Sequence, residues 1–425
     1  MGDVPENKVE RGRIDRTLNK NGGSLSRGSK DDRARFSPTV QNASTRYWTL
    51  WAYIGLAGSL SLRISLLDFE SHDYIFCLRD WYDYFIQHGR WAALKGDFST
   101  YPPLYSYLLS LSTLLPLPKP HSIKLSSILC DYIAAWFAFK IVRCKYPSGP
   151  APLAASLTIL FLPTVWLNSA VWGQCDVIFT TALLATLYYL IVNKPTAAMV
   201  GFGFACSLKP QAIFFVPFLG GWFFRERFSW KCVLAPPLVY ALCGLPAILA
   251  GKPVLELLFH FWRQKNFAVL TQGATNWYQW ISNEYFEVFY MAGIILTMVV
   301  TAFFILSMRN ENEMQPERAT LLITTALLSV LVVPYFLPGM HERYFFAADL
   351  FSVIYAFFTA RGWIVALLIQ FCSFFAYLPY LFEMEPIPRT WLALIMTAAV
   401  GLLIKNFVEL SFCLPKVIEK QKVVT

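Results

Sequence analysis

The stretch 67–105 reads LDFESHDYIFCLRDWYDYFIQHGRWAALKGDFSTYPPLY and is the only long polar segment between apolar runs in the first half of the chain. It carries six carboxylates: Asp68, Glu70, Asp73, Asp80, Asp83 and Asp97. A connection between membrane helices needs only a few residues, and loops longer than about a dozen are usually functional or disordered. This loop is too aromatic to be disordered. We therefore predict a folded loop at the membrane surface that holds a catalytic carboxylate.

The sequence on both sides of this loop is apolar. Of the 425 residues, 56% are hydrophobic and 15% are charged, and many apolar runs approach the roughly 20 residues that span a bilayer. This pattern predicts an all-α polytopic transmembrane bundle over residues 47–412, with about 12–13 spans and with the loop 68–101 outside the membrane. The expected runs lie at about 47–67, 102–117, 121–141, 150–171, 177–193, 196–223, 231–250, 286–307, 318–337, 342–360, 362–382 and 390–412.

The charge distribution predicts the orientation of the bundle. A net charge of +9 would suggest a nucleic-acid partner in a soluble protein. Here Lys and Arg gather in short loops and in the terminal segments 1–46 and 413–425, which is the positive-inside pattern. We therefore predict no nucleic-acid partner and two cytosolic tails, the first of them disordered. The loop 68–101 then lies on the opposite side of a bacterial plasma membrane or an ER membrane.

The cysteines and the nucleotide-binding signatures give negative predictions. Nine cysteines are scattered, mostly within apolar runs, without a CxxC pair. We interpret them as small core residues and predict neither a metal site nor a disulfide framework. The sequence has no GxxxxGK[ST], and GFGFA within an apolar run is not a dinucleotide fingerprint. No cofactor is expected, and nothing in the sequence indicates a divalent metal.

The run 196–223 is interrupted by Lys209-Pro210-Gln211 and is therefore either a broken helix or two half-spans. Counting spans between the first loop and Arg225 also requires at least one re-entrant or half-length run. Irregular backbone at membrane depth is tolerated only where it is buried in protein or lines a wet cavity. We therefore expect a site in this region.

Four polar groups are candidates for chemistry, because ionisable residues in membrane segments are costly. Besides the first loop, they are Trp172-Gly173-Gln174-Cys175-Asp176, Leu208-Lys209-Pro210-Gln211 and Gly339-Met340-His341-Glu342-Arg343-Tyr344. The loop carboxylates suit a general base. Lys209, His341 and Arg343 suit a phosphate and a negatively charged leaving group. A base and a phosphate clamp at a membrane surface fit transfer from a lipid-linked phosphate donor.

Each candidate also has a structural alternative. Asp176 could cap the following helix, and Lys209 could snorkel from a helix end. Glu342 and Arg343 could pair for structure alone. Asp131, in an otherwise apolar run, is better explained by a bond to a neighbouring helix.

The motifs, in order, are Asp73…Trp81-Tyr82, Tyr101-Pro102-Pro103-Leu104-Tyr105, Trp172-Gly173-Gln174-x-Asp176, Leu208-Lys209-Pro210-Gln211 and His341-Glu342-Arg343-Tyr344. Together they resemble the GT-C superfamily of polyprenyl-phosphate-sugar-dependent glycosyltransferases, over about residues 47–412. The resemblance is closest to bacterial membrane mannosyltransferases related to the enzyme that adds the second mannose to GPI anchors. A looser similarity links the chain to ER glucosyltransferases that extend the dolichol-linked oligosaccharide.

The resemblance implies an inverting transfer of a hexose, mannose above others, from a polyprenyl or dolichyl phosphate sugar. The acceptor would be a lipid-linked glycan or another acceptor on the non-cytosolic side. The base would be Asp73, with Asp68 and Glu70 as rivals. The residues implied for the donor phosphate are Lys209, Gln211, His341 and Arg343. Those implied for the substrate are Tyr101, Trp172, Gln174, Asp176, Glu342, Asn276 and Trp280.

The substrate is the least constrained part of this reading, because the stretch Asn276–Trp280 follows the family's Asn/Trp pattern only loosely. Two other function classes share these features. A transporter or flippase for a lipid-linked sugar would also show intramembrane charges and broken helices. An oligosaccharide polymerase or ligase would use a lipid diphosphate donor instead. The long acidic and aromatic loop, together with the lack of a repeat, favours the transferase.

Overall fold

The computed structural model describes residues 38–226, 229–259, 268–308 and 315–413. Residues 1–37 and 414–425, which make up most of the two expected tails, lie outside these ranges. The contacts described below belong to the unit that begins at Trp48. The first helix, α1, spans Pro38–Ile64, so it begins before the expected start at residue 47. The apolar pattern could not indicate these first turns, because they are polar.

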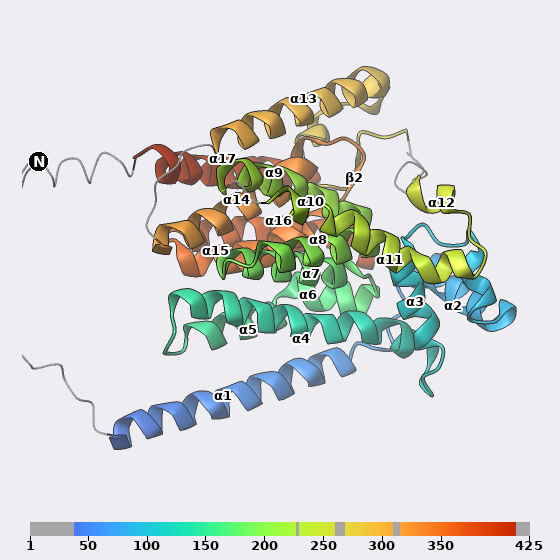
Figure 1. Cartoon of the computed structure of the whole chain (residues 1–425), viewed down its shortest axis with the longest axis horizontal. Helices are drawn as coiled ribbons and strands as arrows, with labels where there is room; N and C mark the ends of the chain where they lie inside the picture. Colours follow the sequence, from blue (N-terminus) through green and yellow to red (C-terminus); the bar gives the residue numbers. More distant parts are fainter. Residues whose placement is uncertain (1–37, 227–228, 260–267, 309–314, 414–425) are drawn as a thin grey trace, which may run out of the picture. The chain divides into compact units, whose positions relative to one another are not determined.

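The described chain is a bundle of helices (Figure 1), which confirms the predicted all-α membrane architecture. The longer helices after α1 are α4 (Lys119–Lys145), α13 (Phe286–Ser307), α14 (Gln315–Phe336), α16 (Gly362–Phe382) and α17 (Arg389–Val408). The shorter ones are α5 (Ala151–Phe161), α6 (Pro163–Trp166), α7 (Asp176–Ile191), α8 (Pro195–Leu208), α9 (Val216–Glu226), α10 (Trp230–Val233), α11 (Ala235–Leu249) and α15 (Phe346–Phe358). Helices α10 and α11 together reach membrane length as Trp230–Leu249. Each expected apolar run contains a helix.

Fewer of these helices have full membrane length than the sequence predicted. Within the described residues, six are long and apolar enough to cross a membrane, or seven if Ala151–Phe161 and Pro163–Trp172 form one bent span. The expected number was about 12–13. The difference arises because several helical runs are short: α7 has 16 residues, α8 has 14 and α15 has 13.

Counting spans predicted at least one half-length or re-entrant run between the first loop and Arg225, and the structure has two irregular segments in that region. Helix α3 (Pro103–Ser112) has 10 residues, or about 15 Å of helix, half the roughly 30 Å hydrocarbon core. The run 196–223 is broken: α8 ends at Leu208, Lys209 is extended, and the 3₁₀ turn η4 (Pro210–Phe215) leads into α9. Pro210 lacks an N–H and disfavours helical backbone at the residue before it, so the helix stops there.

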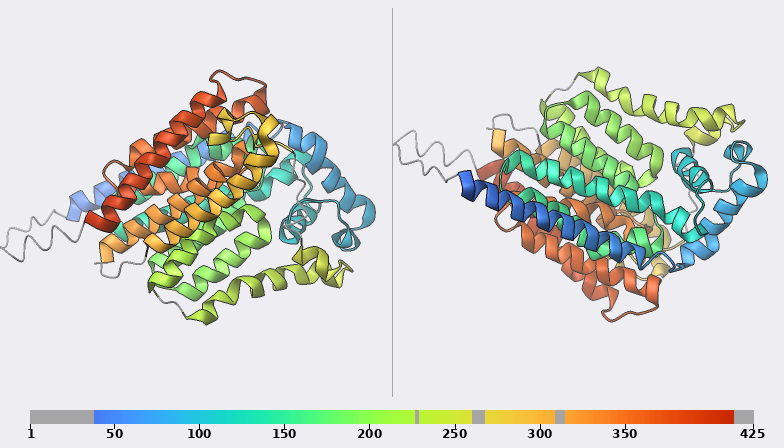
Figure 2. Two further views of the ribbon diagram at one scale, coloured as in Figure 1. Left: turned by 90° about the horizontal axis from the view of Figure 1, so that it is seen from above. Right: turned by 90° about the horizontal axis from the view of Figure 1, so that it is seen from below.

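The first loop is folded, as predicted. After a short π-helical turn, η1 (Tyr74–Leu78), it forms helix α2 (Arg79–His88), which ends at Gly89 with φ 78°. A 3₁₀ turn, η2 (Ala92–Lys95), follows. Three side chains of this loop are buried: Tyr82, Phe85 and Leu94. Figures 1 and 2 show α2, α3 and α12 (Val254–Leu258) at the same end of the bundle.

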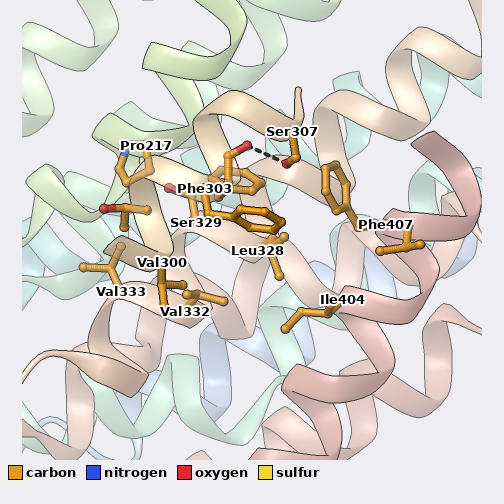
Figure 3. A pocket seen from close by; sticks show the side chains of 13 residues that line it. Pro217, Val300, Phe303, Ser307, Leu328, Ser329, Val332, Val333, Ile404 and Phe407 are labelled. Atoms are coloured by element: carbon orange, nitrogen blue, oxygen red, sulfur yellow. Dashed lines mark hydrogen bonds between the residues drawn. The ribbon is translucent and has the colours of Figure 1, made fainter. Parts of the chain in front are cut away.

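An apolar cavity of about 190 Å³ lies among α9, α13, α14 and α17 (Figure 3). Apart from three hydroxyl groups, its lining side chains are apolar, and they include Val300, Phe303 and Ile404. The hydroxyls donate to backbone carbonyls, as Ser307 does to Phe304 at 2.7 Å. The cavity therefore has the character of a lipid-chain environment rather than of a site for sugar or phosphate.

Candidate active site

The carboxylate of Asp73 is the meeting point of three distant segments. Its Oδ2 accepts a hydrogen bond of 2.8 Å from Trp172 Nε1 and another from the side-chain amide of Gln174. Its Oδ1 accepts a hydrogen bond from the hydroxyl of Tyr380 on α16. The first loop, the Trp172–Asp176 turn and the end of α16 therefore form one hydrogen-bonded site.

The pKa of Asp73 lies below the ordinary value of an aspartate. Burial alone would raise it, but the positive charge of Arg343 and the hydrogen bonds from Tyr380, Trp172 and Gln174 outweigh burial. Opposite charge and donated hydrogen bonds both favour the ionised form. Asp73 is therefore a carboxylate at neutral pH and can accept a proton from a reacting group.

A left-handed glycine turn presents two of these donors. The π-helical turn η3 (Leu167–Trp172) ends at Gly173, with φ 77° and ψ 17°. Glycine adopts this conformation at little steric cost. The backbone N–H of Gln174 then donates to the carbonyl of Asn168 at 2.9 Å. The Gln174 side chain also accepts a hydrogen bond of 3.0 Å from the hydroxyl of Tyr101, which links the entrance of α3 to the site.

Asp176 and Lys209 form a buried ion pair beneath this turn. Lys209 Nζ lies 2.5 Å from Asp176 Oδ1, and each side chain is 1% exposed. The other oxygen of Asp176 accepts a hydrogen bond of 3.0 Å from Asn168 Nδ2. The capping alternative for Asp176 is wrong, because the N-cap of α7 is Cys175 and has no side-chain cap. Snorkelling is also wrong for Lys209, since the ammonium is buried.

Arg343 brings a second cation to the same place. Its guanidinium carbon lies 5.4 Å from the centre of the Trp172 ring. Its Nη1 is 3.4 Å from Glu342 Oε1, and its Nε is 3.9 Å from Asp176 Oδ2. In the described part of the chain, the buried Nε has no hydrogen-bond partner. Arg343 therefore pairs with Glu342, as the structural alternative expected, yet keeps a donor for an anionic ligand.

His341 lies in a two-stranded parallel sheet, and Glu342 begins the 3₁₀ turn η8 (Glu342–Phe345) that follows it. Strand β1 (Thr271–Gln272) pairs with β2 (Met340–His341), with Gln272 opposite His341. Burial, followed by the charge of Arg343, lowers the pKa of His341 to about 3. His341 is therefore neutral at physiological pH and acts as a hydrogen-bonding group rather than as a cation. Burial raises the pKa of Glu342, and Arg343 opposes this shift.

The remaining predicted residues divide into supporting and peripheral positions. Gln211 is buried beside the hydroxyl of Tyr344, and its Oε1 has no partner among the described residues. Asn276 is fully buried and donates to the carbonyl of Pro334 at 3.5 Å, so it supports the loop. Trp280 is 49% exposed at the surface of the same loop.

The rival carboxylates of the first loop lie apart from this site. The side chain of Asp68 is 93% exposed, and its Oδ1 is 2.7 Å from His121 Nε2. Glu70 is also exposed. Neither shares the hydrogen bonds of Asp73, so the geometry favours Asp73 as the base.

Sequence reasoning missed Tyr380 and Asn168. Both lie in runs that read as membrane spans, where a tyrosine or an asparagine looks like an interface or packing residue. The Trp172 ring stacks on Tyr380 with centroids 4.9 Å apart, a contact between residues far apart in sequence. The described residues contain no group of three or more His, Cys, Asp or Glu that could hold a metal ion. The cysteines with described side chains are all free.

The same end of the bundle thus carries the half-buried carboxylate of Asp73, an arginine whose Nε has no partner among the described residues, and a glycine turn. Residues 100–256 match the family model described as dolichyl-phosphate-mannose-protein mannosyltransferase. The match supports a GT-C-type membrane glycosyltransferase. It contains Tyr101, the Trp172–Asp176 turn and Lys209, whereas Asp73 and Arg343 lie outside it. No curated protein matches the chain.

Proposed function

We propose that this protein is an inverting glycosyltransferase that moves a hexose, with mannose expected, from a polyprenyl or dolichyl phosphate sugar. The acceptor is a lipid-linked glycan or another acceptor on the non-cytosolic side of the membrane. The observation that carries the proposal is the hydrogen-bonded carboxylate of Asp73 close to the charge of Arg343. The family match to residues 100–256 supports the donor class.

Asp73 serves as the general base in this proposal. The oxygen of the acceptor hydroxyl attacks the anomeric carbon of the donor sugar, and its proton passes to Asp73. The bond between the anomeric carbon and the phosphate oxygen breaks at the same time, and the lipid phosphate leaves with the bonding electrons. Attack from the face opposite the phosphate inverts the anomeric centre. General-base catalysis of this kind contributes roughly 10²–10⁴-fold in rate.

Arg343 is the main group for the donor phosphate. Charge-assisted hydrogen bonds from a guanidinium fit phosphate oxygens well, and a fixed cation stabilises the charge that develops on the leaving group. Lys209 is buried and paired with Asp176, so Arg343 rather than Lys209 is the first cation to meet the ligand. His341 and Gln211 contribute neutral hydrogen bonds. Tyr101, which is half-buried, offers an aromatic face for the sugar, whereas Trp172 is fully buried and acts through its hydrogen bond to Asp73.

The test uses purified protein in nanodiscs, incubated with radiolabelled dolichyl phosphate mannose, dolichyl phosphate glucose or the corresponding polyprenyl donors, and with an extract of membrane lipids. Transfer of label to an acceptor is expected with one donor. Asp73→Asn should bind that donor but lose at least about a hundredfold in turnover. The matched control is Asp68→Asn, which alters an exposed carboxylate of the same loop. If no donor is used, or Asp73→Asn keeps more than about a tenth of the turnover, the proposal fails.

A further inference from the structure

Helix α4 carries a row of three buried polar side chains on one face. Lys124, Ser127 and Asp131 are spaced three and four residues apart, so they stack on the same side of the helix. Their exposed fractions are 0%, 1% and 0%. Burying polar and charged groups in a membrane bundle costs free energy unless each finds partners. Their partners show what the row holds in place.

Lys124 binds the beginning of the first loop. Its Nζ donates to three backbone carbonyls, those of Leu66 at 3.3 Å, Leu67 at 2.9 Å and Phe69 at 2.6 Å. An ammonium has three N–H donors, so these bonds use all of them. The carbonyls follow the end of α1 and precede Asp73 by only a few residues. Lys124 therefore fixes the segment from which the proposed base projects.

Ser127 and Asp131 bind the segment on the other side of Asp73. Ser127 Oγ donates to the carbonyl of Gln174 at 2.7 Å. Asp131 Oδ2 accepts hydrogen bonds from Ser169 Oγ at 2.6 Å and from Arg63 Nε at 2.7 Å. Asp131 thus bonds neighbouring helices, as expected from its place in an apolar run.

One further hydrogen bond links the two segments to each other directly. Ser71 Oγ, in the first loop, donates to the carbonyl of Trp172 at 2.7 Å. Both segments that meet at Asp73 are therefore attached to α4 and also to each other. The hydrogen bonds from Trp172 and Gln174 to Asp73 then depend on the geometry of α4.

We propose that the buried row Lys124–Ser127–Asp131 positions the base, and that Lys124 in particular is a positioning residue for Asp73. The inference rests on the proposed function. It predicts that Lys124 acts on turnover through Asp73, whereas a purely structural lysine would affect stability without regard to Asp73.

A double-mutant cycle with radiolabelled dolichyl phosphate mannose, or whichever of the donors named above is used, separates these two roles. Lys124→Met should lower kcat on the order of 10²-fold, the loss that a displacement of about 1 Å can cause, with little change in the donor KM. In the Asp73→Asn background, where the base is already absent, the same change should cost less than roughly twofold. Independent, multiplicative losses in the two backgrounds would overturn the proposal.

Two further variants keep the test decisive. Ser127→Ala removes one bond of the row with little change in volume, so it provides the cycle if Lys124→Met does not fold; its loss should also vanish in the Asp73→Asn background. The matched control is Lys140→Met, the same substitution on α4 at a lysine that lies 5.5 Å from the Trp136 ring. A loss in the control equal to that of Lys124→Met would refute the positioning role. Turnover above about a tenth of the native value in Asp73→Asn alone would instead refute the proposed function.

Discussion

The hydrogen bond from Tyr380 to Asp73 offers a direct test of how the fold sets the basicity of the carboxylate. A hydrogen bond to a charged group is worth about 1.5–3 kcal/mol. Tyr380→Phe removes this bond and keeps the ring that stacks on Trp172. Because the ionised form of Asp73 then loses one donor, the pKa of Asp73 should rise.

The sign of the effect on activity follows from the direction of the shift. The native fold lowers the pKa of Asp73, so the base form persists until the pH falls through that lowered value. With a raised pKa, the base form is lost at a higher pH. In Tyr380→Phe, the acidic limb of the pH profile of kcat should shift to higher pH, while turnover near pH 7 is retained.

The measurement is kcat against pH for the native protein and two variants. Tyr377→Phe is the matched control, because Tyr377 lies one turn earlier on α16 and also packs against Trp172, with centroids 5.2 Å apart. Its buried hydroxyl has no hydrogen-bond partner among the described residues, so its removal should leave the limb in place. Coincident limbs in all three proteins would refute the assignment of the limb to Asp73 or the role of Tyr380.

The remaining predictions concern the cations and the orientation. Arg343→Lys should raise the donor KM about tenfold or more, because an ammonium cannot reproduce the bidentate geometry of a guanidinium; an unchanged KM in donor titrations would exclude the phosphate role. Lys209→Met should lower the free energy of unfolding by about 3–5 kcal/mol, because it leaves the buried charge of Asp176 unpaired; thermal unfolding in detergent measures this, and Asp176→Asn should restore part of the loss. Cysteines placed at Ser99 and Glu385 should react with impermeant reagents from the non-cytosolic side, and reaction only after permeabilisation would reverse the topology.

Most helices of the bundle were predictable because a continuous apolar run encodes them. In a membrane, an apolar segment can satisfy its own backbone hydrogen bonds only by forming a helix. The existence of each such helix therefore follows from local sequence. The beginning of α1 and the short lengths of α7 and α15 did not follow. The polar first turns of α1 carry no periodic signal, and the length of a packed helix depends on its neighbours.

The membership of the site was partly predictable. Asp73, Trp172, Gln174 and Arg343 come together as the order of the motifs suggested. Tyr380 was not predictable, because its hydroxyl matters only once α16 lies beside the Trp172–Asp176 turn.

Charge states were harder still, because they depend on contacts across the fold. His341 and Arg343 look like two cations when they are read in sequence. In the folded protein, burial and the neighbouring guanidinium make His341 neutral. Lys209 likewise looks free in sequence, yet Asp176 neutralises it. The proposed phosphate site therefore depends more heavily on Arg343 than a count of basic residues suggests.

The same contacts impose a requirement on catalysis. Trp172, Gln174 and Tyr380 all donate to Asp73, which makes the carboxylate well placed but weakly basic. A base gains in strength when a donated hydrogen bond is withdrawn from its charged form. In the proposed function, the acceptor hydroxyl would approach Asp73 Oδ1, which accepts one described hydrogen bond, that of Tyr380, and would share this oxygen with Tyr380 or displace it. The backbone of Trp172 is held by a hydrogen bond from Ser71, and the backbone of Gln174 by one from Ser127 on α4. We therefore expect Tyr380 to be the donor that is displaced. Binding of the acceptor would then raise the basicity of Asp73 at the moment when a base is needed.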